Sequence, residues 1–193
     1  MPRLSIVKVR CEQDVNSYVL LDTDSREAAV IDPGEPADKI AGQLDGAVLR
    51  WIVATHGHRG HLAGKEALRD SFPGALTAMH MADAKQFLRS ADSYVLDGDT
   101  LEFGGFALRV LHTPGHTPGS LCFVVANHLF TGDTLLAGAL GKQMPGTDLR
   151  QQLMSIGSAF ARLPLATAVY PGHGPVTSLE NELRTNPYLR GPG

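Results

Sequence analysis

The chain has 193 residues, of which 43% are hydrophobic and 19% charged, and these fractions exclude wholesale disorder. A formal net charge of −3 gives no electrostatic basis for nucleic acid or an anionic membrane as a partner. The length suits one domain over residues 1–193. The composition departs from the average in its 21 glycines, its 12 prolines, and its 8 histidines against only 2 cysteines. Metal or acid–base chemistry here would therefore use imidazole and carboxylate, not thiolate.

The N-terminal segment has no long apolar run, and no segment reaches the roughly 18 apolar residues of a membrane span. The sequence therefore predicts a cytoplasmic protein. Cys11 and Cys122 both lie in strand-like segments, and no metal-binding spacing joins them. Two buried, reduced thiols are favoured over a disulfide.

Hydrophobic periodicity and turn residues predict alternating strands and helices. In the first half, strands are expected at 4–10, 18–22, 28–32, 47–55 and 75–80, and helices at 35–46, from after His61 to the Pro73-Gly74 turn, and at 82–91. In the second half, strands are expected at 100–103 and 106–112, as a hairpin within 120–133, and within 167–177. Helices are expected at 148–163 and from 178 to before Pro187. This order predicts an α/β fold in which two packed sheets carry helices outside, a four-layer αββα sandwich.

Five histidines stand where strand-like segments run into turns, which is where functional residues concentrate. In an extended segment residues i and i+2 point the same way, so His56 and His58 can bind one ion. His61 comes three residues later, as a helix begins, and must point elsewhere. That geometry suits two neighbouring ions better than one. His116 and His173 each follow another strand-like segment.

Zinc at a catalytic site needs three or four ligands with an open position, so the motif needs partners from distant loops. His116, His173 and Asp133 are the natural candidates, and a carboxylate can bridge two ions about 3.5–4 Å apart. The alternative, loop histidines without a shared purpose, is disfavoured because several strand-end ligands accompany the motif. Three further histidines lack such a setting and are expected to be ordinary surface or hydrogen-bonded side chains: His80, His112 and His128.

Six blocks of sequence follow one another in a recognisable order: 30–34 (VIDPG), 54–61 (ATHGHRGH), 113–120 (TPGHTPGS), 130–134 (FTGDT), 171–175 (PGHGP) and 186–188 (NPY). Together they resemble the metallo-β-lactamase superfamily, and in particular its small glyoxalase II-like hydrolases. The resemblance implies the αββα metallo-β-lactamase fold and a metal-dependent hydrolase of a thioester or ester-like bond. It implies a small-molecule substrate, an acyl thioester or ester, with no nucleic acid or membrane partner.

The resemblance also implies roles for individual residues. A first metal would be bound by His56, His58 and His116. Asp133 would bridge to a second metal held by His61 and His173, and these last three would be the catalytic residues. The expected metal is zinc, since bound zinc lowers the pKa of water from 15.7 to about 7 and so supplies a hydroxide nucleophile.

The chain departs from the family pattern H-x-H-x-D-H at Gly60, which stands where the family has Asp. Loss of a charged oxygen ligand should weaken the second metal site, so one firmly bound zinc is expected, with the second weak or absent. Alternatively, the chain no longer hydrolyses anything and binds a ligand or partner. A third explanation is that the substitution was introduced, or that another acid such as Asp32 compensates. Unligated, His61 and His173 could act as general base or oxyanion donors.

A single metal also suits a different class of enzyme. Persulfide dioxygenases resemble the same fold, and two histidines with one carboxylate and open positions suit Fe(II). The alternatives to the hydrolase are therefore a mononuclear iron oxygenase of this kind and a non-catalytic binding member of the fold. The extra helical domain of full-length glyoxalase II enzymes is not expected, which weakens the case for a glutathione thioester.

The residues around the motifs leave the substrate open. Arg59 and Lys142 could each meet a substrate carboxylate or simply be solvated. Core packing is favoured over an acyl pocket for the apolar residues that follow the predicted bridging aspartate, Leu135, Leu136, Leu140 and Met144.

Overall fold

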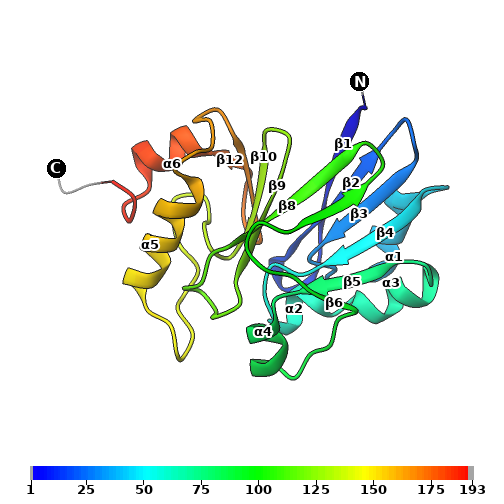
Figure 1. Ribbon diagram of the computed structural model, residues 1–193, viewed down its shortest axis with the longest axis horizontal. Coiled ribbons are helices and arrows are strands. Elements are labelled where there is room, and N and C mark those ends of the chain that lie inside the picture. The colour runs from blue at the N-terminus through cyan, green and yellow to red at the C-terminus, as the bar shows by residue number, and fades with distance from the viewer. Residues whose placement is uncertain (1, 191–193) are drawn as a thin grey trace.

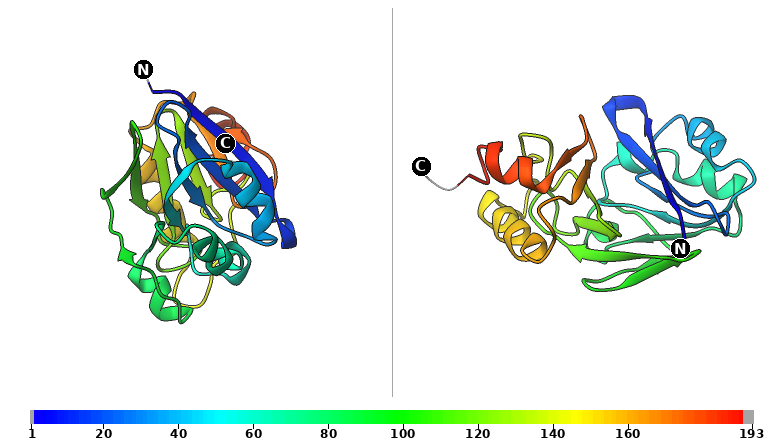
Figure 2. Two further views of the ribbon diagram at one scale, coloured as in Figure 1. Left: turned by 90° about the vertical axis from the view of Figure 1, so that its right-hand side faces the viewer. Right: turned by 90° about the horizontal axis from the view of Figure 1, so that it is seen from above.

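The computed structural model describes residues 2–190. Two six-stranded sheets face each other, and helices cover their outer sides (Figure 1). Viewed from above, the helix pair at the C-terminal end of the chain and the helices near the N-terminal half lie at opposite ends, with both sheets between them (Figure 2). The expected four-layer αββα sandwich is confirmed.

The first sheet has strand order β1-β2-β3-β4-β5-β6. Its first three strands are antiparallel and β3 to β6 run parallel. The strands are β1 (Leu4–Arg10), β2 (Asn16–Asp22), β3 (Glu27–Ile31), β4 (Val48–Val53), β5 (Leu76–Met79) and β6 (Ser93–Tyr94). The helices of this half are η1 (Glu12–Asp14), α1 (Ala37–Ala41), η2 (Gly42–Leu44), α2 (Arg59–Leu62), α3 (Lys65–Ser71) and α4 (Met81–Gln86).

The second sheet has strand order β12-β11-β10-β9-β8-β7, antiparallel except for the parallel pair β10–β11. The strands are β7 (Thr100–Phe103), β8 (Phe106–His112), β9 (Leu121–Val125), β10 (His128–Gly132), β11 (Ala168–Pro171) and β12 (Thr177–Ser178). Helices α5 (Leu149–Phe160) and α6 (Leu179–Thr185) pack outside it.

Strands β2 and β9 are apolar on both faces because each sheet has a core on both sides. In β2, Tyr18 and Leu20 face the second sheet, whereas Val19 packs toward the helices of the first half. In β9, Phe123 enters the same core between the sheets, whereas Cys122 packs toward α5. Because side chains alternate between the two faces of each strand, three core layers form: one between the sheets and one between each sheet and its helices. These three cores separate the four layers of secondary structure.

Several helix boundaries differ from the sequence prediction. The helix expected after His61 instead begins at Arg59 and is interrupted at Ala63 and Gly64, where the Gly64 N–H donates outside the helix to the Pro33 carbonyl at 2.8 Å. The helix expected at 82–91 ends at Gln86, since Leu88 adopts φ 52° and reverses the chain. The 35–46 helix is split into α1 and η2. Strand β6 was not predicted, because two residues are too short for a periodic pattern.

Both cysteines are buried and free, as expected. Burial raises the pKa of the Cys122 thiol to about 12, so this side chain acts as a small apolar group. Across residues 2–190, none of the helices combines the length and the apolar character that a bilayer crossing requires.

The three histidines expected to be ordinary side chains make local contacts outside the two ligand groups. His80 is the N-cap of α4, where its Nδ1 accepts from the Ala82 N–H at 3.2 Å, and its ring stacks on His112. His112 Nε2 lies 3.0 Å from the Pro118 carbonyl oxygen, and His128 Nδ1 lies 3.0 Å from the Tyr170 hydroxyl.

His80 should make stability depend on pH. Burial and the neighbouring His112 lower the pKa of His80 below its usual 6.5, so below that pH the unfolded chain binds a proton more readily than the folded one. Stability contributed by neutral His80 is therefore lost as pH falls from 7 to 5. His80→Asn keeps a capping acceptor without the titration and should flatten this loss, measured by urea unfolding at both pH values. Parallel pH profiles for wild type and variant would contradict it.

Candidate metal centre

The residues predicted to bind metal come from separate strand ends of both sheets and meet in one place. Two come from the loop after β4, one from α2, and the others from the β8–β9 loop and the ends of β10 and β11. Their ligand atoms form two groups, each within 4.8 Å, that share one carboxylate. These residues are His56, His58, His61, His116, Asp133 and His173.

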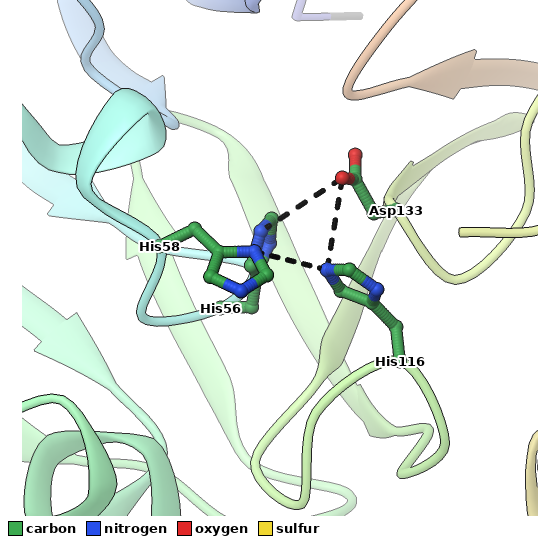
Figure 3. A group of neighbouring side chains, drawn as sticks. All are labelled: His56, His58, His116 and Asp133. Atoms are coloured by element: carbon green, nitrogen blue, oxygen red, sulfur yellow. Dashed lines mark hydrogen bonds and ion pairs between the residues drawn. The ribbon is translucent and has the colours of Figure 1, made fainter. Parts of the chain in front are cut away.

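The first group contains His56, His58, His116 and Asp133 (Figure 3). His116 Nε2 lies 3.1 Å from His58 Nδ1 and 3.6 Å from Asp133 Oδ2. His56 Nε2 lies 4.0 Å from the same oxygen. Ligands bound at about 2.0–2.1 Å around a tetrahedral ion are about 3.3–3.4 Å apart. The group is therefore close to the spacing that a single ion requires.

The second group contains His61, Asp133 and His173. His173 Nε2 lies 3.3 Å from His61 Nε2 and 3.5 Å from Asp133 Oδ2. His61 Nε2 lies 3.8 Å from the other carboxylate oxygen, Oδ1. Asp133 thus stands between the groups, which is the position of a bridging ligand. This group has one carboxylate and two imidazoles and offers fewer protein ligands than the first.

Backbone carbonyls orient two of the imidazoles from behind. His116 Nδ1 donates to the Lys142 carbonyl at 2.6 Å, and His173 Nδ1 donates to the Asp14 carbonyl at 3.0 Å. Because a carbonyl oxygen only accepts, each Nδ1 carries the hydrogen and each Nε2 presents its lone pair to the cluster. This arrangement is typical of metal-binding histidines.

Asp32 helps to orient two more of the imidazoles, those of His56 and His61, from a buried position. His61 Nδ1 lies 3.0 Å from Asp32 Oδ2, and the Thr55 hydroxyl donates to the same carboxylate at 2.7 Å while lying 3.0 Å from His56 Nδ1. The Thr55 N–H donates to Oδ1 at 2.7 Å. Asp32, His56 and His61 also form a third close group, but this carboxylate already accepts from three donors. Asp32 lies at Nδ1 of His61, whereas Nε2 of that ring lies near His173 and Asp133, so the position of Asp32 is that of an orienting group for the second ligand group.

Within the described part of the chain, two buried ligand atoms without hydrogen-bond partners indicate that this set of side chains fits a metal ion. Among residues 2–190, His56 Nε2 and Asp133 Oδ1 are buried without a hydrogen-bond partner. Buried polar atoms almost always have partners, so atoms left open toward a histidine cluster indicate a missing cation. Bound there, a divalent ion would supply Lewis-acid or redox chemistry. Zinc and iron both accept this set of imidazoles and carboxylate.

The electrostatics of the cluster favour neutral imidazoles in the first group. Burial lowers the pKa of His56 well below its usual value, and neighbouring histidines lower it further. Burial likewise lowers the pKa of His58 and of His116. For His61, burial lowers the pKa, but the Asp32 carboxylate outweighs it and the net shift is upward. A neutral imidazole is the form that binds metal.

Gly172 shows how closely the loops approach. A Cβ at this position would lie 2.4 Å from Asp133 Oδ1 and 2.8 Å from His61 Cε1. The loop is held by Asn16, whose N–H donates to the Gly172 carbonyl at 2.7 Å and whose side-chain amide donates to the Pro171 carbonyl at 2.9 Å. Only glycine before His173 lets the second sheet bring that histidine against the cluster.

Gly60 leaves a space that η1 occupies. A Cβ at Gly60 would lie 3.2 Å from both Gln13 Oε1 and Val15 Cγ2. Gln13 has φ 56° within η1, so the backbone turns here in a left-handed conformation. The gap at residue 60 is therefore partly filled by a neutral amide rather than by a carboxylate.

Asp83 is a residue that the sequence did not reveal. It is buried, and its carboxylate accepts from the Gly57 N–H at 2.7 Å, the Thr117 hydroxyl at 2.8 Å and the Gly119 N–H at 2.6 Å. Gly57 lies between His56 and His58, whereas Thr117 follows His116. One side chain of α4 therefore ties together the two loops that form the first group. In the sequence it is only one acid in a helical segment.

Of the other residues that the sequence singled out, some are buried in the core and others are exposed. Leu135 is fully buried in the core under α5, with Leu140 packed against it, which supports core packing for both. Leu136 and Met144 are partly exposed. Lys142 is exposed, and its backbone carbonyl accepts the hydrogen bond from His116 Nδ1. Arg59 is exposed at the start of α2.

A four-layer sandwich with a histidine and aspartate cluster at its strand ends defines a metal-binding α/β protein. A family model described as the metallo-beta-lactamase superfamily matches residues 12–173. The chain therefore belongs to the metallo-β-lactamase superfamily.

Curated relatives differ in the activity for which they are named. The chain is 35% identical over 187 residues to the Homo sapiens protein named persulfide dioxygenase ETHE1, covering 90% of this chain and 70% of that protein. It is 36% identical over 177 residues to the Brucella anthropi protein named hydroxyacylglutathione hydrolase, covering 89% and 66%.

The similar solved structures also carry different names. ETHE1 from Myxococcus xanthus superposes with TM-score 0.86 and 30% identity, covering 95% of this chain and 83% of that one. BLEG-1, a B3 metallo-beta-lactamase, superposes with TM-score 0.87 and 29% identity, covering 97% and 100%. The superfamily is thereby established, and the glyoxalase II-like subtype is not.

Proposed function

We propose that this protein is a mononuclear iron oxygenase acting on a persulfide of a small thiol. The observation that carries the proposal is the 35% identity to a persulfide dioxygenase across nine-tenths of the chain. Such an enzyme adds both atoms of O₂ to the outer sulfur of R–S–SH, and with one water the products are R–SH, sulfite and two protons. Iron would supply the binding and activation of O₂.

The geometry supports one principal ion. The first group offers three imidazoles and a carboxylate, whereas the second lacks a side-chain ligand at Gly60. Two histidines and one carboxylate suffice for Fe(II) in oxygenases and leave positions for substrate and O₂. His61 is then free of a structural metal and, with its pKa raised by Asp32, can hold or move a proton beside the substrate.

A zinc-dependent thioester hydrolase is the second candidate. It is favoured by the second ligand group, His61, Asp133 and His173, and by the likeness to hydroxyacylglutathione hydrolase. In that case His61, Asp133 and His173 would hold a second zinc beside the first ligand group, and zinc would supply a hydroxide nucleophile for the acyl carbon.

Metal analysis with two assays separates the candidates. For the oxygenase we expect about one iron per chain, O₂ uptake with glutathione persulfide, and sulfite as product. Two zinc ions per chain, thiol release from an acyl-glutathione thioester and no O₂ uptake would overturn it in favour of the hydrolase. Absence of tightly bound metal at neutral pH would overturn both and leave a non-catalytic member of the fold.

Gly60→Asp tests the one-metal arrangement directly. The new carboxylate should raise the metal content from about one to about two ions per chain, because it adds a charged ligand to the second group. The flexible end of Gln13 and the Val15 side chain must each move by a few tenths of an ångström to admit it. Elemental analysis after loading and desalting is the measurement. Gly74→Asp, at a position with open space, is the control, and two ions already present in wild type would contradict the prediction.

A further inference from the structure

A second cluster of charge lies beside the metal centre, between α2, α3 and the end of α4. It lines a pocket of about 280 Å³ that contains three cationic side chains, Arg59, Lys65 and Arg89, and one acid, Glu66. Lys65 is 8% exposed, and its ammonium donates to the Ser90 carbonyl at 2.8 Å and pairs with Glu66 at 3.0 Å. The two arginines therefore leave an excess of positive charge in the pocket.

The Arg89 side chain has a buried hydrogen-bond donor for which the described part of the protein supplies no partner. Its Nε is buried and has no hydrogen-bond partner among residues 2–190, and within that range its guanidinium makes no ion pair. The backbone is built to place it there: Leu88 adopts φ 52°, and the Arg89 N–H donates to the Ala84 carbonyl at 2.8 Å, which closes α4. Arg89 is partly exposed as a whole, but its Nε–H is shielded from water without a partner among the described residues, which is costly and points to an anionic acceptor.

We infer that this pocket binds an anionic group, a carboxylate or a phosphate. Planar guanidinium groups match both anions with paired hydrogen bonds, and a low-dielectric wall strengthens them. The pocket volume of about 280 Å³ is large enough to admit such a group.

The pocket adjoins the metal centre through shared elements. Arg59 directly follows His58, and Leu62, which also lines the pocket, directly follows His61. Phe87, just before Leu88, packs its ring against His58 with centroids 5.1 Å apart. The anionic group can therefore belong to a substrate whose reacting atom lies at the metal, an assignment that rests on the proposed function, or it can be a free anion.

Binding of inorganic phosphate to the metal-loaded protein tests the site without using its activity. By isothermal titration calorimetry, Arg89→Met should weaken phosphate binding about 10-fold or more, because a charge-assisted partner is lost. Without phosphate the same variant should melt at a higher temperature than wild type, since a shielded Nε–H that residues 2–190 leave without a hydrogen-bond partner is removed. Arg109→Met, at an exposed strand position, is the matched control.

Phosphate bound directly at the metal would remain in both proteins, so the comparison isolates the pocket. Arg59→Gln, at an exposed position, replaces Arg89→Met if that variant does not fold, and should weaken phosphate binding in the same direction. A phosphate isotherm unchanged by these substitutions overturns the proposal. Steady-state kinetics decide whether the bound anionic group belongs to a substrate or is a free anion. If the substitution raises KM only for acidic substrates, and phosphate competes with them, the group belongs to a substrate. An unchanged KM indicates a free anion.

Discussion

Asp133→Asn is expected to reduce metal affinity at least about 100-fold and to bring the activity close to background. Changes in groups that only support a ligand already cost 10–100-fold, and Asp133 is the one carboxylate shared by both ligand groups. The variant should nevertheless fold, with stability of the metal-free form within about 1 kcal/mol of wild type, because removing the charge breaks no hydrogen bond at the orphaned Oδ1. Elemental analysis, steady-state kinetics and urea unfolding measure the three quantities.

Asp45→Asn provides the control for Asp133, since it makes the same chemical change at an exposed position. Retention of both metal and activity by Asp133→Asn would remove this residue from the centre. Loss of folding would show that its role is structural. Only the combination of a folded protein with lost metal agrees with the arrangement described above.

Asp83→Asn should produce the largest loss of stability, about 2–4 kcal/mol, and a 10–100-fold loss of metal affinity. Its carboxylate accepts from three buried donors, and an amide must turn its NH₂ toward at least one of them. The loops carrying His58 and His116 would then no longer be held together. Urea unfolding of the metal-free protein and competition with a chelator are the measurements.

Asp70→Asn, which is exposed, serves as the control for Asp83. If Asp83→Asn lowered stability but left metal affinity unchanged, Asp83 would support the fold without positioning the ligands. Asp83→Glu restores the charge in a crowded site, where a Cβ on Gly119 would already lie 2.6 Å from the carboxylate, so it should rescue little.

Most of the fold was accessible from local patterns. The strand predicted at 4–10 coincides with β1, and the helix predicted at 148–163 contains α5 with Asp148 as its N-cap, accepting from the Gln151 N–H. These elements have clear periodicity or a capping residue, which act over a few neighbours. The interrupted helix at Gly64 was not accessible, because there the backbone N–H donates to the carbonyl of Pro33, which is distant in sequence.

For the candidate site too, some features could be predicted from neighbouring residues and others depend on contacts between distant segments. The spacing of His56, His58 and His61, and the placement of the other ligands after strands, indicated metal chemistry by composition and order alone. Asp32 was singled out as a substitute ligand, whereas the structure places it behind His61 as an orienting group. Its strand-end position was visible in the sequence, but the direction of its carboxylate was not.

The amino-acid sequence by itself predicted the αββα sandwich and the candidate ligands, because these depend on side-chain type and on short-range period. The superfamily was indicated by the resemblance of six ordered sequence blocks. Only the tertiary structure decided how the ligands divide into two groups sharing Asp133, and that Gln13 lies against the gap at Gly60. It also decided that Asp83 joins two loops and that Arg89 is left without a partner. Those features arise where segments far apart in the chain come within a few ångströms, and no periodicity records such contacts.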